Sequence, residues 1–208
     1  MARVDFAFAG LRLTTDERLL APREWTAAQS RWAADLLPTL PPGPVLELCA
    51  GAGHIGLAAV HESDRPLVAV DREETATTHV LLNAGLLGIS DRVEARCSPL
   101  GEAIAPHEQF PLVIADPPWV RRSDIGRYPQ DPPEAIDGGT DGLDIARECV
   151  QVIDRHLAPG GAALLQLGSA QQVSELELPR TLAVDEVREF PRGALVRMGR
   201  PAHPTTST

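Results

Sequence analysis

Short apolar runs alternate with amphipathic stretches through most of this chain. Continuous or nearly continuous apolar runs are typical of strands that are buried on both faces of a sheet. The run at 93–97 alternates apolar and polar residues instead, which makes it a weaker strand signal. The pattern predicts five strands, at Val45–Cys49, Leu67–Val70, Val93–Cys97, Leu112–Ala115 and Ala162–Leu167.

Between and around these runs, apolar residues recur at the three- and four-residue spacing of helices. Leu143, Ala146, Val150 and Ile153, for example, form one stripe. This spacing predicts helices at Trp25–Leu37, Ile55–His61, Glu73–Leu87 and Asp141–Leu157. We expect Asp141 to cap the last of these helices, because an Asp side chain can accept a hydrogen bond from a free N–H of the first turn. Since strand and helix follow each other in repetition, we expect a parallel sheet with right-handed crossovers.

Near the C-terminus, Leu182–Phe190 and Leu195–Met198 predict an antiparallel pair that closes one edge of the sheet. No segment rich in Gly, Ser or charge divides the 208 residues. We therefore expect one α/β domain with a doubly wound, seven-stranded, mostly parallel sheet and an antiparallel C-terminal hairpin. Residues 1–40 are expected to form a helical extension of this domain, 41–200 its main part, and 201–208 a disordered tail.

The chain has a formal net charge of -10, with 29 acidic and 19 basic side chains. Nucleic-acid binders usually present a basic face, so the charge counts against a nucleic-acid substrate, although an acidic protein can still contain a basic groove. No segment approaches the ~20 apolar residues of a membrane span, and Met1–Gly10 lacks the basic start and long apolar run of a signal peptide. We therefore expect a cytoplasmic protein without a membrane partner. The sequence leaves the oligomeric state open.

The cysteines and histidines do not show the spacing of a metal site. Cys49, Cys97 and Cys149 are widely separated, and neither a C-x-x-C nor an H-x-x-x-H pair occurs. We expect three small buried hydrophobic residues in a reducing compartment, and no protein-bound metal.

A glycine-rich turn follows the first predicted strand. Gly51, Gly53 and Gly56 match G-x-G-x-x-G, the pattern of a nucleotide-binding turn that opens a helix. Asp71 ends the second strand about 20 residues later, where a carboxylate can accept hydrogen bonds from both hydroxyls of a ribose. One alternative is a tight strand-to-helix turn without a ligand. For Asp71 alone, another alternative is an acid that caps the next helix.

The acid ahead of this turn separates two nucleotide-binding interpretations. Glu47 lies four residues before Gly51, in the pattern E-x-x-x-G-x-G. A carboxylate near the turn would repel the pyrophosphate of a dinucleotide and would suit a ligand with a positive charge. The pattern resembles the first motif of class I methyltransferases, whose cofactor carries a cationic sulfonium.

The sharpest feature is Asp116-Pro117-Pro118-Trp119, at the end of the fourth predicted strand. The prolines fix their own φ and lack N–H groups, so this turn offers carbonyl acceptors rather than donors. Asp116 adds a carboxylate acceptor, and Trp119 adds a flat apolar face for stacking. This set suits a planar amino group, held by Asp116 and the Pro117 carbonyl for in-line displacement at a methyl group. The alternative is that Pro-Pro only ends a strand and Trp119 fills the core.

Several segments in the same order resemble one family, the class I S-adenosylmethionine-dependent methyltransferases related to the release-factor glutamine methyltransferases. The resemblance runs from Leu20 to Met198, nearly the whole chain. Its segments are Ala21–Thr26 (Pro-Arg-x-x-Thr), Glu47–Gly56 with Asp71, Asp116–Trp119 (Asn/Asp-Pro-Pro-aromatic), Pro133–Leu143 (Gly-Gly-x-Asp-Gly-Leu), Leu157–Gly161, and Gln166–Gly168 with Gln171.

The resemblance implies an enzyme that uses S-adenosyl-L-methionine as its cofactor. It also implies that Asp116 and the Pro117 carbonyl hold the substrate nitrogen and that Trp119 packs against it, which makes these three the candidate catalytic residues. Ser98 falls near the adenine, although the acid that the family has there is missing. Arg23 and Thr26 either order the loop over the cofactor or simply begin a helix. The candidate cofactor contacts are Arg23, Thr26, Glu47, Cys49, Ala50, Gly51, Gly53, Asp71, Arg72, Ser98 and Asp116.

Two departures from the family bear on the substrate. Residues 1–40 are too few for the separate recognition domain of the glutamine-specific members, and the tetrapeptide starts with Asp, as in enzymes that act on the adenine amino group. We therefore predict an N-methyltransferase for a planar amino or amide nitrogen of a protein side chain or a small molecule. Two alternatives stay open. One is an adenine-N6 methyltransferase on RNA or DNA, with Arg121, Arg122 and Arg127 as its basic residues; the other is a non-catalytic, cofactor-binding partner subunit.

Overall fold

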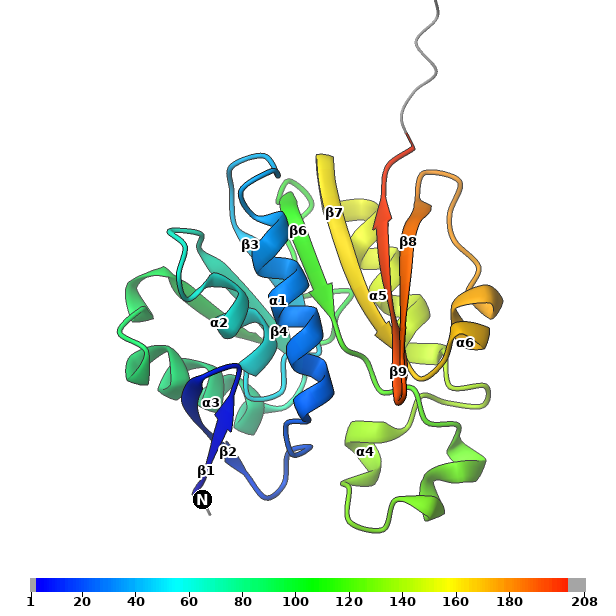
Figure 1. Cartoon of the computed structure of the whole chain (residues 1–208), viewed down its shortest axis with the longest axis horizontal. Helices are drawn as coiled ribbons and strands as arrows, with labels where there is room; N and C mark the ends of the chain where they lie inside the picture. The colour runs from blue at the N-terminus through cyan, green and yellow to red at the C-terminus, as the bar shows by residue number, and fades with distance from the viewer. Residues whose placement is uncertain (1–2, 202–208) are drawn as a thin grey trace, which may run out of the picture.

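The computed structural model describes residues 3–201, except for the side chain of Glu24. At its centre lies a seven-stranded sheet with the strand order β5-β4-β3-β6-β7-β9-β8 (Figure 1). Strands β3 to β7 are parallel, and β9 runs antiparallel between β7 and the edge strand β8. The strands of this sheet are β3 (Val45–Leu48), β4 (Leu67–Asp71), β5 (Val93–Cys97), β6 (Phe110–Ala115), β7 (Leu157–Leu167), β8 (Ala183–Phe190) and β9 (Gly193–Gly199).

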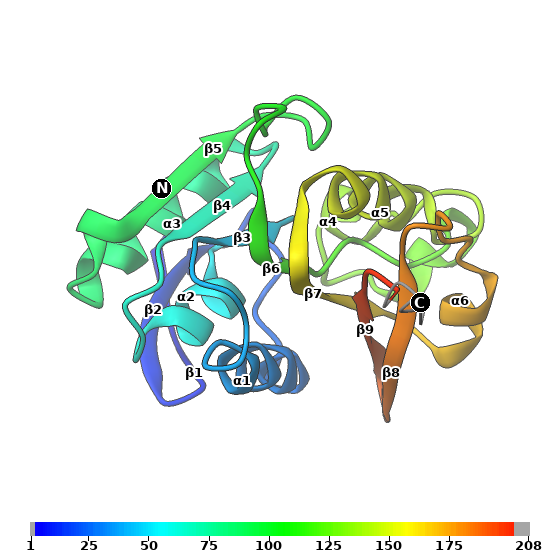
Figure 2. The same cartoon turned by 90° about the horizontal axis from the view of Figure 1, so that it is seen from above.

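Alternate residues of each central strand face two different layers of helices, because side chains of a strand point to opposite faces in turn. On β3, Val45 belongs to the hydrophobic cluster of α1, α2 and α3, whereas Leu46 and Leu48 belong to the cluster of α5. Figure 2 shows α1 and α2 on one side of the sheet and α5 on the other. The α-helices are α1 (Ala27–Leu36), α2 (His54–Val60), α3 (Glu74–Leu86), α4 (Pro133–Ile136), α5 (Asp144–His156) and α6 (Ala170–Glu175).

The predicted α/β class, the parallel strands and the antiparallel C-terminal pair are confirmed. The strand predicted at Ala162–Leu167 is longer and starts at Leu157, with a shift of register against β6. The predicted cap at Asp141 is wrong, because the helix begins at Asp144 and has no side-chain cap. The Asp141 carboxylate instead accepts a hydrogen bond from the Leu143 N–H at 3.0 Å and pairs with Arg147.

The chain begins with a β-hairpin that the apolar pattern did not predict. Its strands are β1 (Arg3–Phe8) and β2 (Leu11–Asp16), and the turn residues Ala9 and Gly10 both have positive φ, as a two-residue hairpin turn requires. The hairpin packs on α3: the Thr14 N–H donates to Asn83 Oδ1 at 2.7 Å, and Asn83 Nδ2 donates to the Thr14 carbonyl at 2.9 Å. The N-terminal extension is therefore a hairpin followed by a helix.

The described part of the chain also contains 3-10 helices at Glu24–Thr26 (η1), Ser90–Arg92 (η2) and Arg122–Arg127 (η3). Within residues 3–201, no helix has the length and apolar character to cross a membrane. The predicted tail lies outside the described residues, apart from Pro201. The prediction of three buried cysteines is wrong for Cys97, which is exposed; Cys49 is partly exposed and Cys149 is buried.

Candidate active site

A cavity of about 650 Å³ opens at the carboxyl ends of β3, β4 and β6, where ligands bind in open α/β sheets. The turn after β3 forms its floor, and a loop between the hairpin and α1 forms one wall. The loop after β5, α5 and the segment after β6 form the rest. The lining residues are Arg18 to Arg23, Thr26, Cys49, Ala50, Gly51, His54, Ile55, Asp71, Arg72, Glu73, Thr75, Pro99, Leu100, Asp116, Pro118, Pro132, Glu134, Ala135, Ile145 and Glu148.

The three glycines of the turn after β3 have different surroundings. Gly51 has φ +52 and lines the cavity, and a Cβ there would meet no atom within 4 Å. Gly53 has φ +74 and lies against Val80 of α3, so that a Cβ would come to 3.0 Å from that side chain. Gly56 lies directly over the Glu47 carboxyl. Only the first glycine therefore gives a ligand close access to the backbone.

Glu47 lies beneath the turn, and it is not among the residues that line the cavity. Its side chain is 2% exposed, and Oε1 accepts a hydrogen bond from the Gly56 N–H at 2.9 Å. Oε2 has no partner within the described residues. Burial raises the pKa of Glu47 to about 8, because the charged form loses its hydration. Glu47 therefore supports the glycine turn from below and does not face the cavity.

Asp71 ends β4 and lines the cavity. One carboxylate oxygen accepts a hydrogen bond from the Gly51 N–H at 2.8 Å, and the other accepts one from the Glu73 N–H at 3.0 Å. Burial raises the pKa of Asp71, against the effect of these two bonds. Asp71 thus fixes the glycine turn to the start of α3, and each oxygen keeps a lone pair that can face a ligand.

Asp116 directly follows β6 and lines the cavity together with Pro118. No hydrogen bond or ion pair to its carboxyl occurs within residues 3–201. Burial raises the pKa of Asp116 to about 7. The structure therefore presents an acceptor without a protein donor at the end of a central strand.

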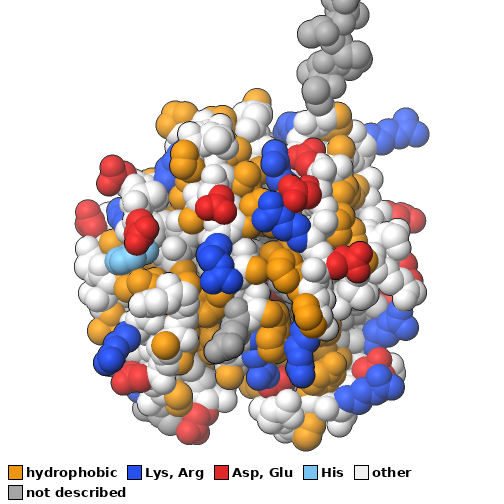
Figure 3. Space-filling model, viewed as in Figure 1, with side chains coloured by type: hydrophobic (Ala, Val, Ile, Leu, Met, Phe, Trp, Pro, Cys, Tyr) orange, Lys and Arg blue, Asp and Glu red, His pale blue; other side chains and the backbone are white. Residues whose placement is uncertain are grey.

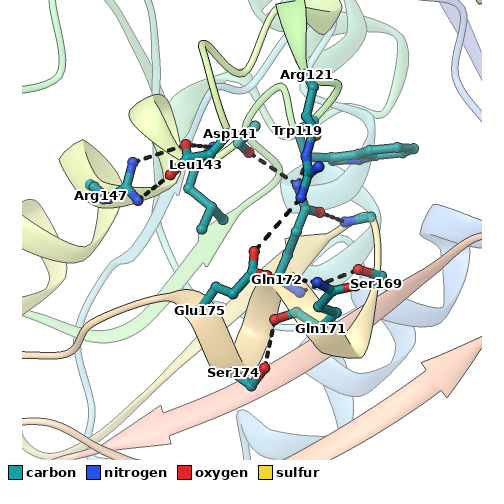
Figure 4. Close-up of polar contacts among 12 residues, drawn as sticks. Trp119, Arg121, Asp141, Leu143, Arg147, Ser169, Gln171, Gln172, Ser174 and Glu175 are labelled. Atoms are coloured by element: carbon teal, nitrogen blue, oxygen red, sulfur yellow. Dashed lines mark hydrogen bonds and ion pairs between the residues drawn. The ribbon is translucent and has the colours of Figure 1, made fainter. Parts of the chain in front are cut away.

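Pro117 and Trp119 lie outside the residues that line the cavity. Pro117 is buried, and the Trp119 ring packs on Gly168, where a Cβ would collide with the ring. The Trp119 carbonyl accepts a hydrogen bond from Gln172 Nε2 at 3.0 Å (Figure 4). The structure thus brings Asp116 and Pro118 to the cavity but not the ring that was predicted to stack on the substrate.

Comparisons with known proteins find similar sequences and similar folds. No family model matches the chain. A ribosomal protein uL3 glutamine methyltransferase of Francisella tularensis is 30% identical over 174 residues, which cover 79% of this chain and 54% of that protein. A release factor glutamine methyltransferase of Clostridium acetobutylicum is 29% identical over 195 residues, which cover 89% of this chain and 68% of that protein. The chain spans 54% to 59% of the length of three curated relatives.

Solved structures share the fold at low sequence identity. A ribosomal protein L11 methylase from Lactobacillus delbrueckii has a TM-score of 0.67 at 16% identity, over 90% of this chain and 84% of that one. An RNA methyltransferase from Salinibacter ruber in complex with S-adenosyl-L-homocysteine has a TM-score of 0.52 at 17% identity, over 85% of this chain and 90% of that one. The chain has the fold of class I methyltransferases. Its sequence is similar to part of the length of curated glutamine methyltransferases.

Two arginines hold the mouth of the cavity together. Arg23 forms an ion pair with Asp131, and Arg72 Nη2 donates a hydrogen bond to the Glu134 carbonyl at 3.2 Å. Asp131 lies between η3 and α4, and Glu134 lies on α4. The two contacts therefore attach this segment to the start of η1 and to the end of β4. Thr26 lines the cavity and donates from Oγ1 to the Arg23 carbonyl at 2.7 Å. The predicted residues Arg23, Thr26 and Arg72 therefore meet at the mouth.

One predicted cofactor contact lies outside the cavity, and one lining residue was not predicted from the sequence. Ser98 does not line the cavity; its N–H donates to the Asp71 carbonyl at 3.0 Å, and the residues after it, Pro99 and Leu100, form the wall. His54 lines the cavity between the glycine turn and the hairpin, with its ring edge-on to Phe8. Burial lowers the pKa of His54 to about 4, so the imidazole is neutral at pH 7.

Gln172 joins three segments behind the Asp116 turn. Its Nε2 donates to the carbonyls of Trp119 at 3.0 Å and Gly142 at 3.3 Å, and its Oε1 accepts from the Gly168 N–H at 2.9 Å. The resemblance points to Gln171, but that side chain is exposed and contacts Glu175. The sequence did contain a signal, because Ser169 and Gln172 form the S-x-x-Q pattern of a capping box.

Gln29 of α1 supports the same turn from the opposite layer. Its side chain is completely buried, and Nε2 donates to the carbonyls of Ala115 at 2.9 Å and Leu164 at 3.2 Å. Ala115 directly precedes Asp116, and Leu164 lies on the neighbouring strand β7. A helix of the predicted N-terminal extension thus holds the strand end from which Asp116 projects.

Proposed function

We propose that this domain transfers a methyl group from S-adenosylmethionine to the amide nitrogen of a protein side chain. The observation that carries the proposal is Asp116, a carboxyl that lines the cavity and has no donor within the described residues. Asp116 is partly buried, and an acceptor that is partly removed from water and lacks a protein donor can gain a hydrogen bond from a ligand with N–H groups. The names of the relatives support a glutamine side chain as the acceptor.

The cavity fits the cofactor in size, acceptors and charge. Its volume of about 650 Å³ lies within the range of small-molecule sites. Asp71 offers carboxylate oxygens to the ribose hydroxyls, and the open space above Gly51 lets a ligand approach the backbone. The lining has five acidic side chains and three arginines, and each arginine is paired with an acid, which suits a cationic sulfonium.

When bound, S-adenosylmethionine supplies a methyl group that is activated by the positive charge on sulfur. The residues of this chain hold and orient the nitrogen that attacks it. Asp116 accepts a hydrogen bond from the N–H₂ group, which turns the nitrogen lone pair toward the methyl group and increases its electron density. The raised pKa of Asp116, about 7, also suits a group that takes up the proton that the nitrogen loses.

The charges beside the site favour a protein over a nucleic acid. Arg121, Arg122 and Arg127 follow the Asp116 turn, but they pair with Glu175, Asp137 and Asp124. On the face that Figure 3 draws, basic and acidic side chains are interspersed rather than separated into a basic patch. Phosphate groups would have to compete with these three carboxylates for the arginines, so this arrangement favours RNA or DNA less than an unpaired basic patch would.

The test is transfer of a labelled methyl group to candidate acceptors. The purified protein is incubated with methyl-tritiated S-adenosylmethionine and with a ribosomal protein uL3, a peptide release factor, or ribosomal RNA. We expect label in one of the two proteins, on a glutamine side chain identified by mass spectrometry of the peptides. Label in the RNA alone would support the adenine alternative. The same reaction is repeated with cell extract, which can supply a partner protein. If the cofactor binds but no protein is labelled even then, the proposal is contradicted.

A further inference from the structure

Two acids on the cavity wall, Glu134 and Glu148, have carboxylates without a partner in the described residues and without a role in the proposed reaction. Glu148 lies on α5 and lines the cavity. Its carboxylate makes no hydrogen bond or ion pair with the part of the chain that the structure describes. Asp71, by comparison, accepts hydrogen bonds from two backbone N–H groups, and Glu73 pairs with Arg72. Glu148 is therefore available to a ligand.

The wall around Glu148 is apolar. Ile145 lies three residues earlier on the same face of α5 and also lines the cavity. Pro99 and Leu100, from the loop after β5, line it as well, and Leu100 belongs to the same hydrophobic cluster as Cys149, the neighbour of Glu148. An apolar wall with one carboxylate at its border suits a flat heterocycle that carries an amino group.

The strand order says which part of the cofactor reaches this wall. Along the carboxyl edge of the sheet, the loop of Leu100 follows β5, Asp71 ends β4, the glycine turn follows β3, and Asp116 follows β6. In the cofactor, the ribose lies between the sulfonium and the adenine. With the ribose at Asp71 and the methyl group near Asp116, the adenine extends toward β5. The loop after β5 offers Pro99 and Leu100 there, and the side chain of Ser98 does not line the cavity.

We propose that Glu148 accepts a hydrogen bond from the exocyclic amine of the adenine, while Ile145, Pro99 and Leu100 pack on the ring. The proposal rests on the use of S-adenosylmethionine proposed above. A carboxylate can only accept hydrogen bonds, so it selects a purine with an amino group over one without it. An acid on α5 thus binds the adenine amine, whereas Ser98, the residue directly after β5, does not line the cavity.

The experiment compares two ligands by calorimetric titration into the intact protein. One is S-adenosylhomocysteine, and the other is its purine analogue, in which hydrogen replaces the exocyclic amine. A hydrogen bond to a charged acceptor predicts that the wild type binds the first ligand about 10-fold more tightly. Glu148→Ala should weaken S-adenosylhomocysteine by about 10-fold and the purine analogue by less than about 2-fold, so that the preference disappears.

Glu102→Ala is the matched control, because Glu102 is an exposed acid of the loop after β5 that does not line the cavity. This variant should keep the full preference for the adenine. A preference that persists in Glu148→Ala, or that falls equally in both variants, would overturn the assignment of Glu148 and leave the proposed function intact. If the wild type binds neither ligand, the proposed use of the cofactor fails, and the inference fails with it.

Discussion

Asp71 ends β4 and Asp116 directly follows β6, the two strands on either side of β3, and the two carboxyls differ in their hydrogen-bond partners. Both line the same cavity. The Asp71 carboxylate accepts hydrogen bonds from the N–H groups of Gly51 and Glu73. The Asp116 carboxyl has no donor within residues 3–201, and burial raises its pKa to about 7. One acid is thus fixed before any ligand arrives, whereas the other is left for the ligand to satisfy.

This difference separates cofactor binding from methyl transfer. A carboxylate held by the backbone is a preorganised acceptor, so a hydroxyl pair can bind to it without rearrangement. An unsatisfied acceptor contributes most when a donor reaches it in the reacting complex. We therefore expect changes at Asp71 to act on cofactor affinity and changes at Asp116 to act on turnover.

The largest effect is expected from Asp116→Ala, which removes the acceptor for the substrate nitrogen. Turnover at saturating cofactor should fall by about 100- to 1,000-fold, as is common when a group that orients or accepts a proton in the reaction is lost. Methyl transfer under single-turnover conditions measures it. A variant with more than one tenth of the wild-type rate would show that the nitrogen is held by something else.

Gln172→Leu should loosen the three segments behind the Asp116 turn. It leaves the carbonyls of Trp119 and Gly142 and the Gly168 N–H without this partner, at a cost of about 2 kcal/mol in the free energy of unfolding. Urea denaturation measures the loss. The neighbouring variant Gln171→Leu is the control, since that side chain is exposed and should change stability by less than about 0.5 kcal/mol.

The pH dependence of kcat/KM should report the ionisation of Asp116. The carboxylate form accepts the N–H hydrogen bond, and its pKa lies at about 7, so kcat/KM should rise with pH and reach a plateau above that value. We expect about a tenfold difference between pH 6 and pH 8. Asp116→Asn keeps an acceptor oxygen but cannot ionise, so the rise should vanish in that variant. A rise that survives would assign the ionisation to another group, with Glu47 as the first candidate.

The smallest effect is expected from Gln29→Leu, which removes the donor to Ala115 and Leu164. We expect a loss of about 1 kcal/mol in stability, because the variant also removes a buried Oε1 that has no partner within the described residues. Turnover should fall by about 3-fold, with an unchanged dissociation constant of the cofactor, because only the strand end before Asp116 shifts. Gln151→Leu, an exposed position on α5, should change neither quantity.

The sequence predicted the order of strands and helices because buried parallel strands are continuous apolar runs. It did not reveal the N-terminal hairpin, since the turn residues Ala9 and Gly10 lack the Asn-Gly pattern that marks such turns, and Ala9 adopts a positive φ that is uncommon for alanine. The position of Glu47 could have been derived. It shares a face of β3 with Val45, which points to the layer of α2 and not to the cavity.

The tetrapeptide shows what the sequence alone could not predict. Its prolines fix φ and favour an extended backbone, but these restraints do not say which side chains face the cavity. Asp116 and Pro118 do, whereas Trp119 turns away and packs on Gly168. Gln29 and Glu148 come from helices that are distant in sequence, so only the packing of the two layers on the sheet brings them to the site.

The different roles of the two acids are tested most directly by calorimetric titration of S-adenosylmethionine into Asp71→Ala and Asp116→Ala. Loss of the ribose acceptor should raise the dissociation constant about 100-fold in Asp71→Ala, whereas Asp116→Ala should stay within about 3-fold of the wild type. Thermal unfolding of both variants checks that they are folded. Equal losses of affinity in the two variants, or a larger loss in Asp116→Ala, would contradict the account.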